Sequence, residues 1–197
     1  GNSVVPTAFT IDKTLPTISV VYDNNSAENT NYYKAERTAT ITITEHNFNA
    51  GRVVTTITAK DDGAPTTVPT VSGWTTNGNV HTATIRYAGD ALYSFDIAFT
   101  DMAGNVAADF TQQTFYVDKT NPTLEITGVE NNFANSGDVI PVVSYSDTNY
   151  DSSKVTITLT GANRGPVELE GSYADIHNGR TFTFKNFVKE QAVDDIY

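Results

Sequence analysis

The sequence of 197 residues contains no cysteine, and its 12 lysine and arginine residues are outnumbered by 23 aspartate and glutamate residues. Without cysteine no disulfide can cross the fold, so apolar packing must stabilise it alone. The net charge of −11 leaves no basic face to displace counterions from nucleic acid, and it opposes adsorption to anionic lipid. We therefore expect neither nucleic acid nor a charged membrane surface as a partner.

Helical periodicity and catalytic motifs are absent as well. No segment repeats its apolar residues at helical spacing, and no signal peptide or membrane-spanning run is present. The chain lacks the Gly-x-Ser-x-Gly, P-loop, His-Glu-x-x-His and paired-cysteine patterns. Its three histidines, His46, His81 and His177, are widely separated. We expect a protein that is not an enzyme and that does not insert into a membrane.

The amino-acid composition of the chain is typical of β-strands. Threonine is abundant, followed by valine, isoleucine, tyrosine and phenylalanine, which favour β-strands. With 39% apolar and 18% charged residues, the composition is that of a globular protein.

One stretch occurs twice. Residues 9–18, FTIDKTLPTI, return as residues 115–124, FYVDKTNPTL. The separation of 106 residues between Asp12 and Asp118 is about the length of one β-sandwich domain. Each copy is interpreted as the last strand of one domain, a polar hinge and the first strand of the next. The proline suits the entry of a strand, since it cannot donate a ladder hydrogen bond.

The repeat predicts three parts. Residues 1–12 are expected to be the last strand of a preceding repeat, or alternatively a free N-terminal strand that docks on the first domain. Residues 13–118 form a complete domain. In this domain, alternating apolar residues predict short strands over 17–22, 38–44, 53–59, 81–87, 92–100 and 110–117. Such strands, separated by turns every eight to twelve residues, describe a two-sheet sandwich.

Residues 119–197 are predicted to be a second domain that is truncated at its C-terminus. Residues 143–150 match residues 41–48, and Asn178-Gly179 matches Asn77-Gly78. The copy stops at residues 194–197, which match residues 90–93. A sandwich without its last two strands exposes sheet edges and loses core. We expect either disorder there or completion by a neighbouring chain.

Local signals of the fold carry a family resemblance. Tyr93 follows Gly89-Asp90 where a tyrosine corner is expected, and residues 101–105, DMAGN, form the turn into the last strand. Together with the DKT and PT residues of the hinge, these motifs resemble the tandem bacterial Ig-like domains of large surface and adhesin-type proteins. The resemblance covers essentially the whole chain.

This resemblance implies an all-β fold of tandem immunoglobulin-like β-sandwich domains joined by short proline-containing hinges. It implies a non-enzymatic, extracellular stalk or adhesion segment at the bacterial cell surface, next to further repeats of the same chain. Two alternatives stay open, because a fold does not determine a function. One is a module that binds a glycan or a host surface protein, and the other is an accessory region of a secreted glycan-acting hydrolase.

Four residues are candidates for an interdomain calcium site. Asp12 and Asp118 lie in the hinges, and Asp101 and Asn105 lie in a loop at one end of the first domain. Oxygen ligands of this kind suit Ca²⁺, and some bacterial Ig-like arrays are similar in placing hinge and loop aspartates around this ion. Alternatively these aspartates only cap turns through the backbone, and the lysine that follows each hinge aspartate competes for its carboxylate.

Trp74 is the candidate ligand-binding aromatic residue. It follows a loop rich in proline, threonine and glycine, and loops carry most binding surfaces. A sugar could stack on its ring. The alternative is that Trp74 packs on the core, as aromatic residues do in sandwiches that lack a disulfide.

Overall fold

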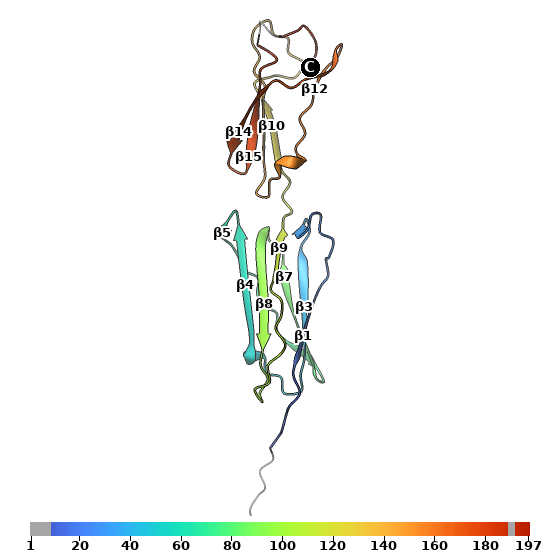
Figure 1. Ribbon diagram of the computed structural model, residues 1–197, viewed down its shortest axis with the longest axis vertical. Helices are drawn as coiled ribbons and strands as arrows, with labels where there is room; N and C mark the ends of the chain where they lie inside the picture. The colour runs from blue at the N-terminus through green and yellow to red at the C-terminus, as the bar shows by residue number, and fades with distance from the viewer. Residues whose placement is uncertain (1–8, 189–191) are drawn as a thin grey trace, which may run out of the picture. The chain divides into compact units, whose positions relative to one another are not determined.

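The computed structural model describes residues 9–188 and 192–197, and in these residues the chain is all-β (Figure 1). It divides into two compact units, Gly1–Lys119 and Thr120–Tyr197. The predicted all-β class is confirmed. No helix in the described part of the chain is long and apolar enough to cross a membrane.

A four-stranded antiparallel sheet forms one layer of the first unit. Its order is β1 (Thr17–Tyr22), β3 (Arg37–Thr44), β7 (Val80–Tyr87) and β6 (Thr75–Asn77). β3 alternates between buried and more exposed residues. Ala39, Ile41 and Ile43 are fully buried, as their spacing in the sequence predicted.

The second sheet of this unit has five strands. Its order is β2 (Tyr32–Tyr33), β9 (Gln113–Val117), β8 (Ala91–Phe99), β4 (Val53–Asp61) and β5 (Ala64–Pro65). β2 runs parallel to β9, and the other pairs are antiparallel. The 3-10 turn η1 (Ala50–Arg52) leads into β4. The strand predicted over residues 110–117 is shorter in the structure: residues 110–112 form no strand, and β9 begins three residues later than predicted.

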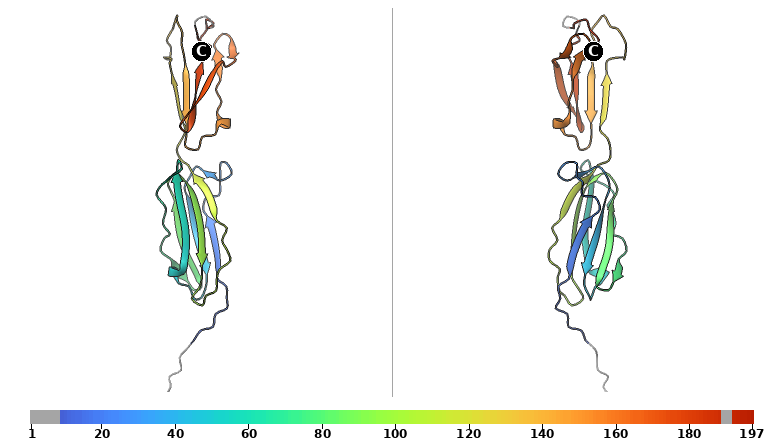
Figure 2. Two further views of the ribbon diagram at one scale, coloured as in Figure 1. Left: turned by 60° about the vertical axis from the view of Figure 1, so that its left-hand side comes forward. Right: turned by 90° about the vertical axis from the view of Figure 1, so that its right-hand side faces the viewer.

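The two sheets face each other (Figure 2), and one hydrophobic core is formed by side chains of both. Its largest fully buried aromatic side chains are Tyr87, Tyr93, Phe95, Phe99 and Phe115. Several of these rings meet edge-on, such as Tyr87 and Phe115, whose centroids are 5.0 Å apart, a favourable geometry for aromatic pairs. The layered arrangement is consistent with a β-sandwich, and aromatic packing stabilises it without a disulfide.

The second unit has a similar four-stranded sheet and a smaller core. The order is β10 (Thr123–Thr127), β11 (Val142–Ser146), β15 (Gly179–Phe184) and β14 (Gly171–Ile176). The 3-10 turn η2 (Ser152–Lys154) precedes a two-stranded sheet of β12 (Leu159–Gly161) and β13 (Gly165–Val167). Its buried core residues are Val143, Tyr145, Phe182 and Phe184.

The assignment of residues 1–12 to the last strand of a preceding repeat stays a prediction. Residues 1–8 lie outside the described range, and residues 9–16 pair with no strand. Phe9 and Ile11 are 84% and 72% exposed, so their alternation finds no sheet to pack on. Among the described residues, Asp12 is hydrogen-bonded to Asn47 and Asn105 of the first unit.

Candidate functional site: a carboxylate cluster in the first unit

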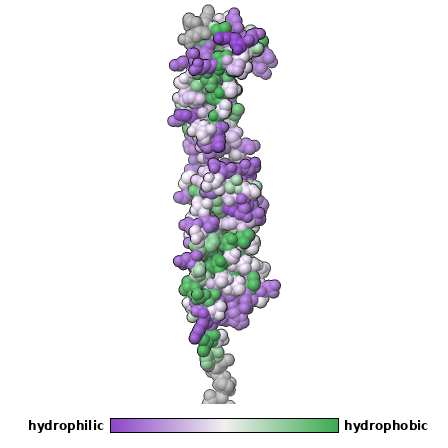
Figure 3. Space-filling view, turned by 45° about the vertical axis from the view of Figure 1, so that its right-hand side comes forward, coloured by the Kyte–Doolittle hydropathy of each residue, from purple (hydrophilic) through white to green (hydrophobic). Residues whose placement is uncertain are grey.

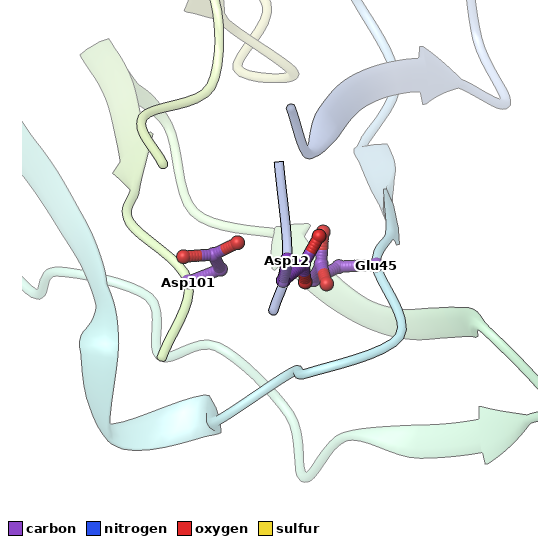
Figure 4. A group of neighbouring side chains, drawn as sticks. All are labelled: Asp12, Glu45 and Asp101. Carbon is purple, nitrogen blue, oxygen red and sulfur yellow. The ribbon is translucent and has the colours of Figure 1, made fainter. Parts of the chain in front are cut away.

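Three carboxylates converge at one end of the first unit (Figure 4). Glu45 directly follows β3, Asp101 follows β8 after one residue, and Asp12 comes from the segment before β1. One carboxylate oxygen of each residue lies within 4.8 Å of those of the other two. The strands β3 and β8 end at the same end of the unit (Figure 1), which is why residues far apart in sequence meet here.

Asp101 is held by its own turn. Its side chain is fully buried, and Asn105 donates to it twice, from the backbone N–H to Oδ1 and from Nδ2 to Oδ2, both at 2.8 Å. Burial alone would raise the pKa of Asp101, but the hydrogen bonds from Asn105 and the neighbouring turn amides outweigh it and lower the pKa. Asp101 is therefore an anion at neutral pH.

Asp12 ties the N-terminal segment to the unit. Its Oδ1 accepts from the Thr14 N–H at 2.9 Å, and its Oδ2 accepts from Asn47 Nδ2. These two hydrogen bonds, that from Thr14 first, lower the pKa of Asp12. Asn105 Nδ2 also donates to the Asp12 carbonyl at 3.3 Å. Two asparagines thus position the segment beside the other carboxylates.

Glu45 carries an unsatisfied oxygen. The residue is only 3% exposed, and its Oε1 accepts from the Asn47 N–H at 2.7 Å. Its Oε2 is buried and has no hydrogen-bond partner among the described residues. A buried carboxylate oxygen without a partner is costly. A ligand at this point would remove that cost.

The backbone behind Glu45 is fixed by His81. The imidazole is 5% exposed and stacks on Phe48 with centroids 3.9 Å apart. His81 Nε2 lies 2.8 Å from the Glu45 carbonyl oxygen, which can only accept, so Nε2 donates this hydrogen bond, and Nδ1 lies 2.9 Å from Thr76 Oγ1. His81 therefore positions the backbone of Glu45.

The cluster suits a hard divalent cation. Within the described ranges, no lysine, arginine or histidine forms an ion pair with Asp12, Glu45 or Asp101. Ca²⁺ takes six to eight oxygen ligands, carboxylates foremost, whereas zinc prefers nitrogen and sulfur. Three converging carboxylates without a counter-charge are therefore a candidate calcium centre.

The predicted calcium residues are only partly brought together. Asp12, Asp101 and Asn105 lie in this cluster, but Asp118 does not. Asp118 follows β9, and β9 ends beside Ala91, the first residue of β8, whereas Asp101 lies beyond the last residue of β8. The two ends of β8 are the two ends of the unit, so Asp118 cannot contribute to this centre.

Sequence reasoning missed Glu45 and Asn47. A signal for both is present, because residues 45–47, EHN, match residues 147–149, DTN, in the second unit. The local geometry repeats too. Asp147 Oδ1 accepts a hydrogen bond from the Asn149 N–H at 2.8 Å, just as Glu45 Oε1 accepts one from the Asn47 N–H. An acid and an asparagine kept in both copies point to a shared local role.

Trp74 lies in a packing position. The ring is half-buried and contacts the core, and its centroid is 5.1 Å from that of Phe48. Phe48 in turn packs on Phe99 and His81. The packing that was the alternative for Trp74 is therefore present, and a ligand-binding role for this residue stays a prediction.

Comparison of the chain with known protein families, with curated proteins and with solved structures found no match.

Proposed function

We propose that this chain is a non-enzymatic segment of an extracellular bacterial surface protein, built from immunoglobulin-like modules that form a stalk. The strand order of the first unit supports this proposal. One sheet has the order β1, β3, β7, β6 and the other contains β9, β8, β4, which correspond to the two sheets of an immunoglobulin sandwich. The repeated hinge sequence adds support, since a short hinge with a proline limits bending between modules.

The observation that carries the proposal is the position of Asp12 in the carboxylate cluster. Asp12 belongs to the hinge segment, whereas Glu45 and Asp101 belong to the body of the first unit. A Ca²⁺ ion shared by the three would fix the hinge to the module. A stalk needs such fixation, because each freely rotating hinge adds flexibility to the whole.

Calcium binding is tested by thermal unfolding of the full chain in a chelator and in millimolar CaCl₂. A ligand at a hundredfold excess over its Kd stabilises the folded state by about 2.7 kcal/mol, so we expect a clear rise of the first unit's Tm. The variant Glu45→Gln keeps the shape of the side chain and removes its charge, and it should abolish that rise. Without calcium it should be at least as stable as the original chain, because one of three repelling charges is gone.

The matched control is Asp61→Asn, which removes one charge from an exposed position at the end of β4. It should keep the full response to calcium. A Tm that is the same in chelator and in calcium would disprove the calcium centre. A Glu45→Gln variant that is destabilised equally in both conditions would show that Glu45 acts through folding alone.

Fixation of the hinge is tested by a distance measurement. Because the chain has no cysteine, spin labels can be placed at Ile11→Cys and Val54→Cys, which are 72% and 62% exposed. We expect a broad distance distribution in chelator and a narrow one in calcium. A distribution that stays broad although calcium binds would contradict the role of the ion in stiffening a stalk.

A further inference from the structure

Two tyrosines are stacked face to face on the five-stranded sheet of the first unit. β2 and β9 run parallel, and their register places Tyr32 beside Tyr116. The ring centroids are 4.2 Å apart, and the ring planes differ by only 2°. Phe115 and Val117, the neighbours of Tyr116 in β9, are buried. Because side chains alternate along a strand, the stacked pair points away from the core.

The other tyrosine pairs among the described residues have a different geometry. Their ring centroids are 5.0 to 6.4 Å apart, and their planes are inclined by 40° to 64°. They are Tyr22 with Tyr87, Tyr87 with Tyr93, and Tyr145 with Tyr150. Both rings of the stacked pair are half-buried, so this pair combines close parallel stacking with access from solvent.

The surface and the hydroxyl groups favour a reaction at this pair. On the face drawn in Figure 3, patches of apolar side chains lie among polar ones, a surface that a small water-soluble reagent can approach. Burial raises the pKa of Tyr32, and the phenol of Tyr116 raises it further, in part through a hydrogen bond between the two side chains. The two hydroxyl groups, and the ring carbons next to them, are therefore close together.

Stacked phenols are arranged for radical coupling. When an oxidant removes one electron and the hydroxyl proton from a tyrosine, it leaves a phenoxyl radical. The unpaired electron of this radical is shared between the oxygen and the ring carbons beside and opposite it, in orbitals perpendicular to the ring. In a face-to-face pair these orbitals point at each other, whereas in an edge-on pair they do not.

We propose that Tyr32 and Tyr116 form an oxidative cross-linking site, at which one-electron oxidants join the two rings as dityrosine. Each phenol loses one electron to the oxidant and one proton to water. The two radicals then form one carbon–carbon bond between the ring positions next to the hydroxyl groups, and the hydrogens of these carbons move to the oxygens. The product keeps both hydroxyl groups and has lost two hydrogen atoms in total.

The cross-link changes how the first unit responds to a pulling force. Tyr32 and Tyr116 are 84 residues apart in the sequence, and a covalent bond between them closes the intervening chain into a loop. A force applied to the ends of the unit then passes directly from one tyrosine to the other and bypasses this loop. The cross-linking reaction is independent of the calcium centre, but its mechanical consequence rests on the proposed stalk function.

The test illuminates the dilute full chain with a ruthenium trisbipyridyl complex and persulfate, which takes up the electrons and is reduced to sulfate. We expect dityrosine fluorescence and a monomer whose mass is lower by two hydrogen atoms. Tryptic peptides should be joined in pairs, with fragment spectra that place the bond between Tyr32 and Tyr116. Free tyrosine that is oxidised in the same way shows that the oxidant is active.

Tyr32→Phe and Tyr116→Phe each keep the ring and remove the hydroxyl group. Neither variant should lose the two hydrogen atoms, whereas both should unfold in urea like the original chain before oxidation. The matched control is Tyr173→Phe, which changes a tyrosine of the second unit that is 52% exposed. It should form the cross-link like the original chain.

Three outcomes would overturn the proposal. They are absence of the cross-link although free tyrosine reacts, a cross-link that persists in Tyr32→Phe, and a bond that joins other tyrosines. Pulling on the ends of the cross-linked chain tests the mechanical consequence separately. The extension gained when the first unit unfolds should be shorter by roughly 280 Å, since an extended residue spans about 3.3–3.6 Å. An unchanged extension in a chain that carries the bond would disprove the bypass of the loop.

Discussion

At the scale of single residues, Arg37 organises one end of the first core. Its guanidinium carbon lies 3.9 Å from the ring centroids of both Tyr22 and Tyr33, and 4.5 Å from that of Phe115. The residue is only 5% exposed, and Nε donates to the Asn24 carbonyl at 2.8 Å. Contacts of this kind stabilise a desolvated cation, so the charge is held by rings and a carbonyl in place of a carboxylate.

Tyr22 makes this region sensitive to alkali. Burial raises its pKa to about 12, although the charge of Arg37 acts in the opposite direction. In the unfolded chain the phenol titrates near its ordinary pKa of about 10. The folded state therefore retains the proton longer, and its stability is complete below about pH 10 and is lost as the pH rises towards 12.

We predict that the Tm of the first unit falls as the pH is raised from about 9.5 to 11.5, and that Tyr22→Phe makes this fall shallower. Thermal unfolding followed by circular dichroism measures the slope. Tyr173→Phe, which changes an exposed tyrosine of the second unit, should leave the slope of the first unit unchanged. If the Tm of Tyr22→Phe fell with pH as steeply as that of the original chain, the attribution of this pH dependence to Tyr22 would be wrong.

The candidate site could be predicted only in part from the sequence. Asp12, Asp101 and Asn105 stand in hinge and turn motifs, which local spacing reveals. Glu45 follows a strand and joins the cluster only because β3 and β8 end at the same end of the unit. Asp118 repeats Asp12 in sequence, yet it lies at the opposite end. Which residues meet depends on strand direction, and a repeat by itself does not contain that information.

At the scale of elements, the connection between β7 and β8 is pinned by a tyrosine. Tyr93 is 2% exposed, and its hydroxyl donates to the Gly89 carbonyl at 2.9 Å, which confirms the predicted tyrosine corner. Tyr197 makes the same bond to Val193, but this residue is 43% exposed. The same bond therefore has two different environments in one chain.

We predict that Tyr93→Phe lowers the free energy of unfolding of the first unit by about 1 kcal/mol, the usual contribution of a neutral hydrogen bond. Tyr197→Phe should cost the second unit less, because water can replace the bond at an exposed position. Urea unfolding of the two variants compares them directly. A larger loss from Tyr197→Phe would contradict this ranking.

Strands with clean alternation, such as β3 and β4, were predictable because one of their faces is buried. The hairpin turns were less predictable from the sequence. Asn178-Gly179 was matched to Asn77-Gly78, but the two dipeptides lie at different points of their hairpins. Gly78 lies in the turn, with φ 59°. In the second unit Asn178 lies in the turn, with φ 51°, and Gly179 is the first residue of β15 and pairs with Ile176 of β14. A Cβ at Gly179 would lie 2.0 Å from the Tyr145 carbonyl oxygen. The same dipeptide thus serves a turn in one unit and a close strand approach in the other.

At the scale of the whole molecule, the two units have separate cores of unequal size. Fourteen buried residues form the first core and four form the second, as far as the described residues extend. Hydrophobic stabilisation grows with buried apolar area. The second unit also leaves Leu124 and Ile126 of β10 mostly exposed. Their counterparts in the register of β1, Ile18 and Val20, pack on the first core. The first unit should therefore be the more stable of the two.

We predict that calorimetry of the chain shows two unfolding transitions, the lower one from the second unit. Ile41→Ala, at a fully buried position of β3, should destabilise the first unit by about 2–5 kcal/mol and move only the upper transition. Val143→Ala, at the matching position of β11, should cost roughly 2 kcal/mol and move only the lower one. If both substitutions shifted a single common transition, the units would unfold as one cooperative body. If Ile41→Ala moved the lower transition, the order of stabilities inferred from the cores would be wrong.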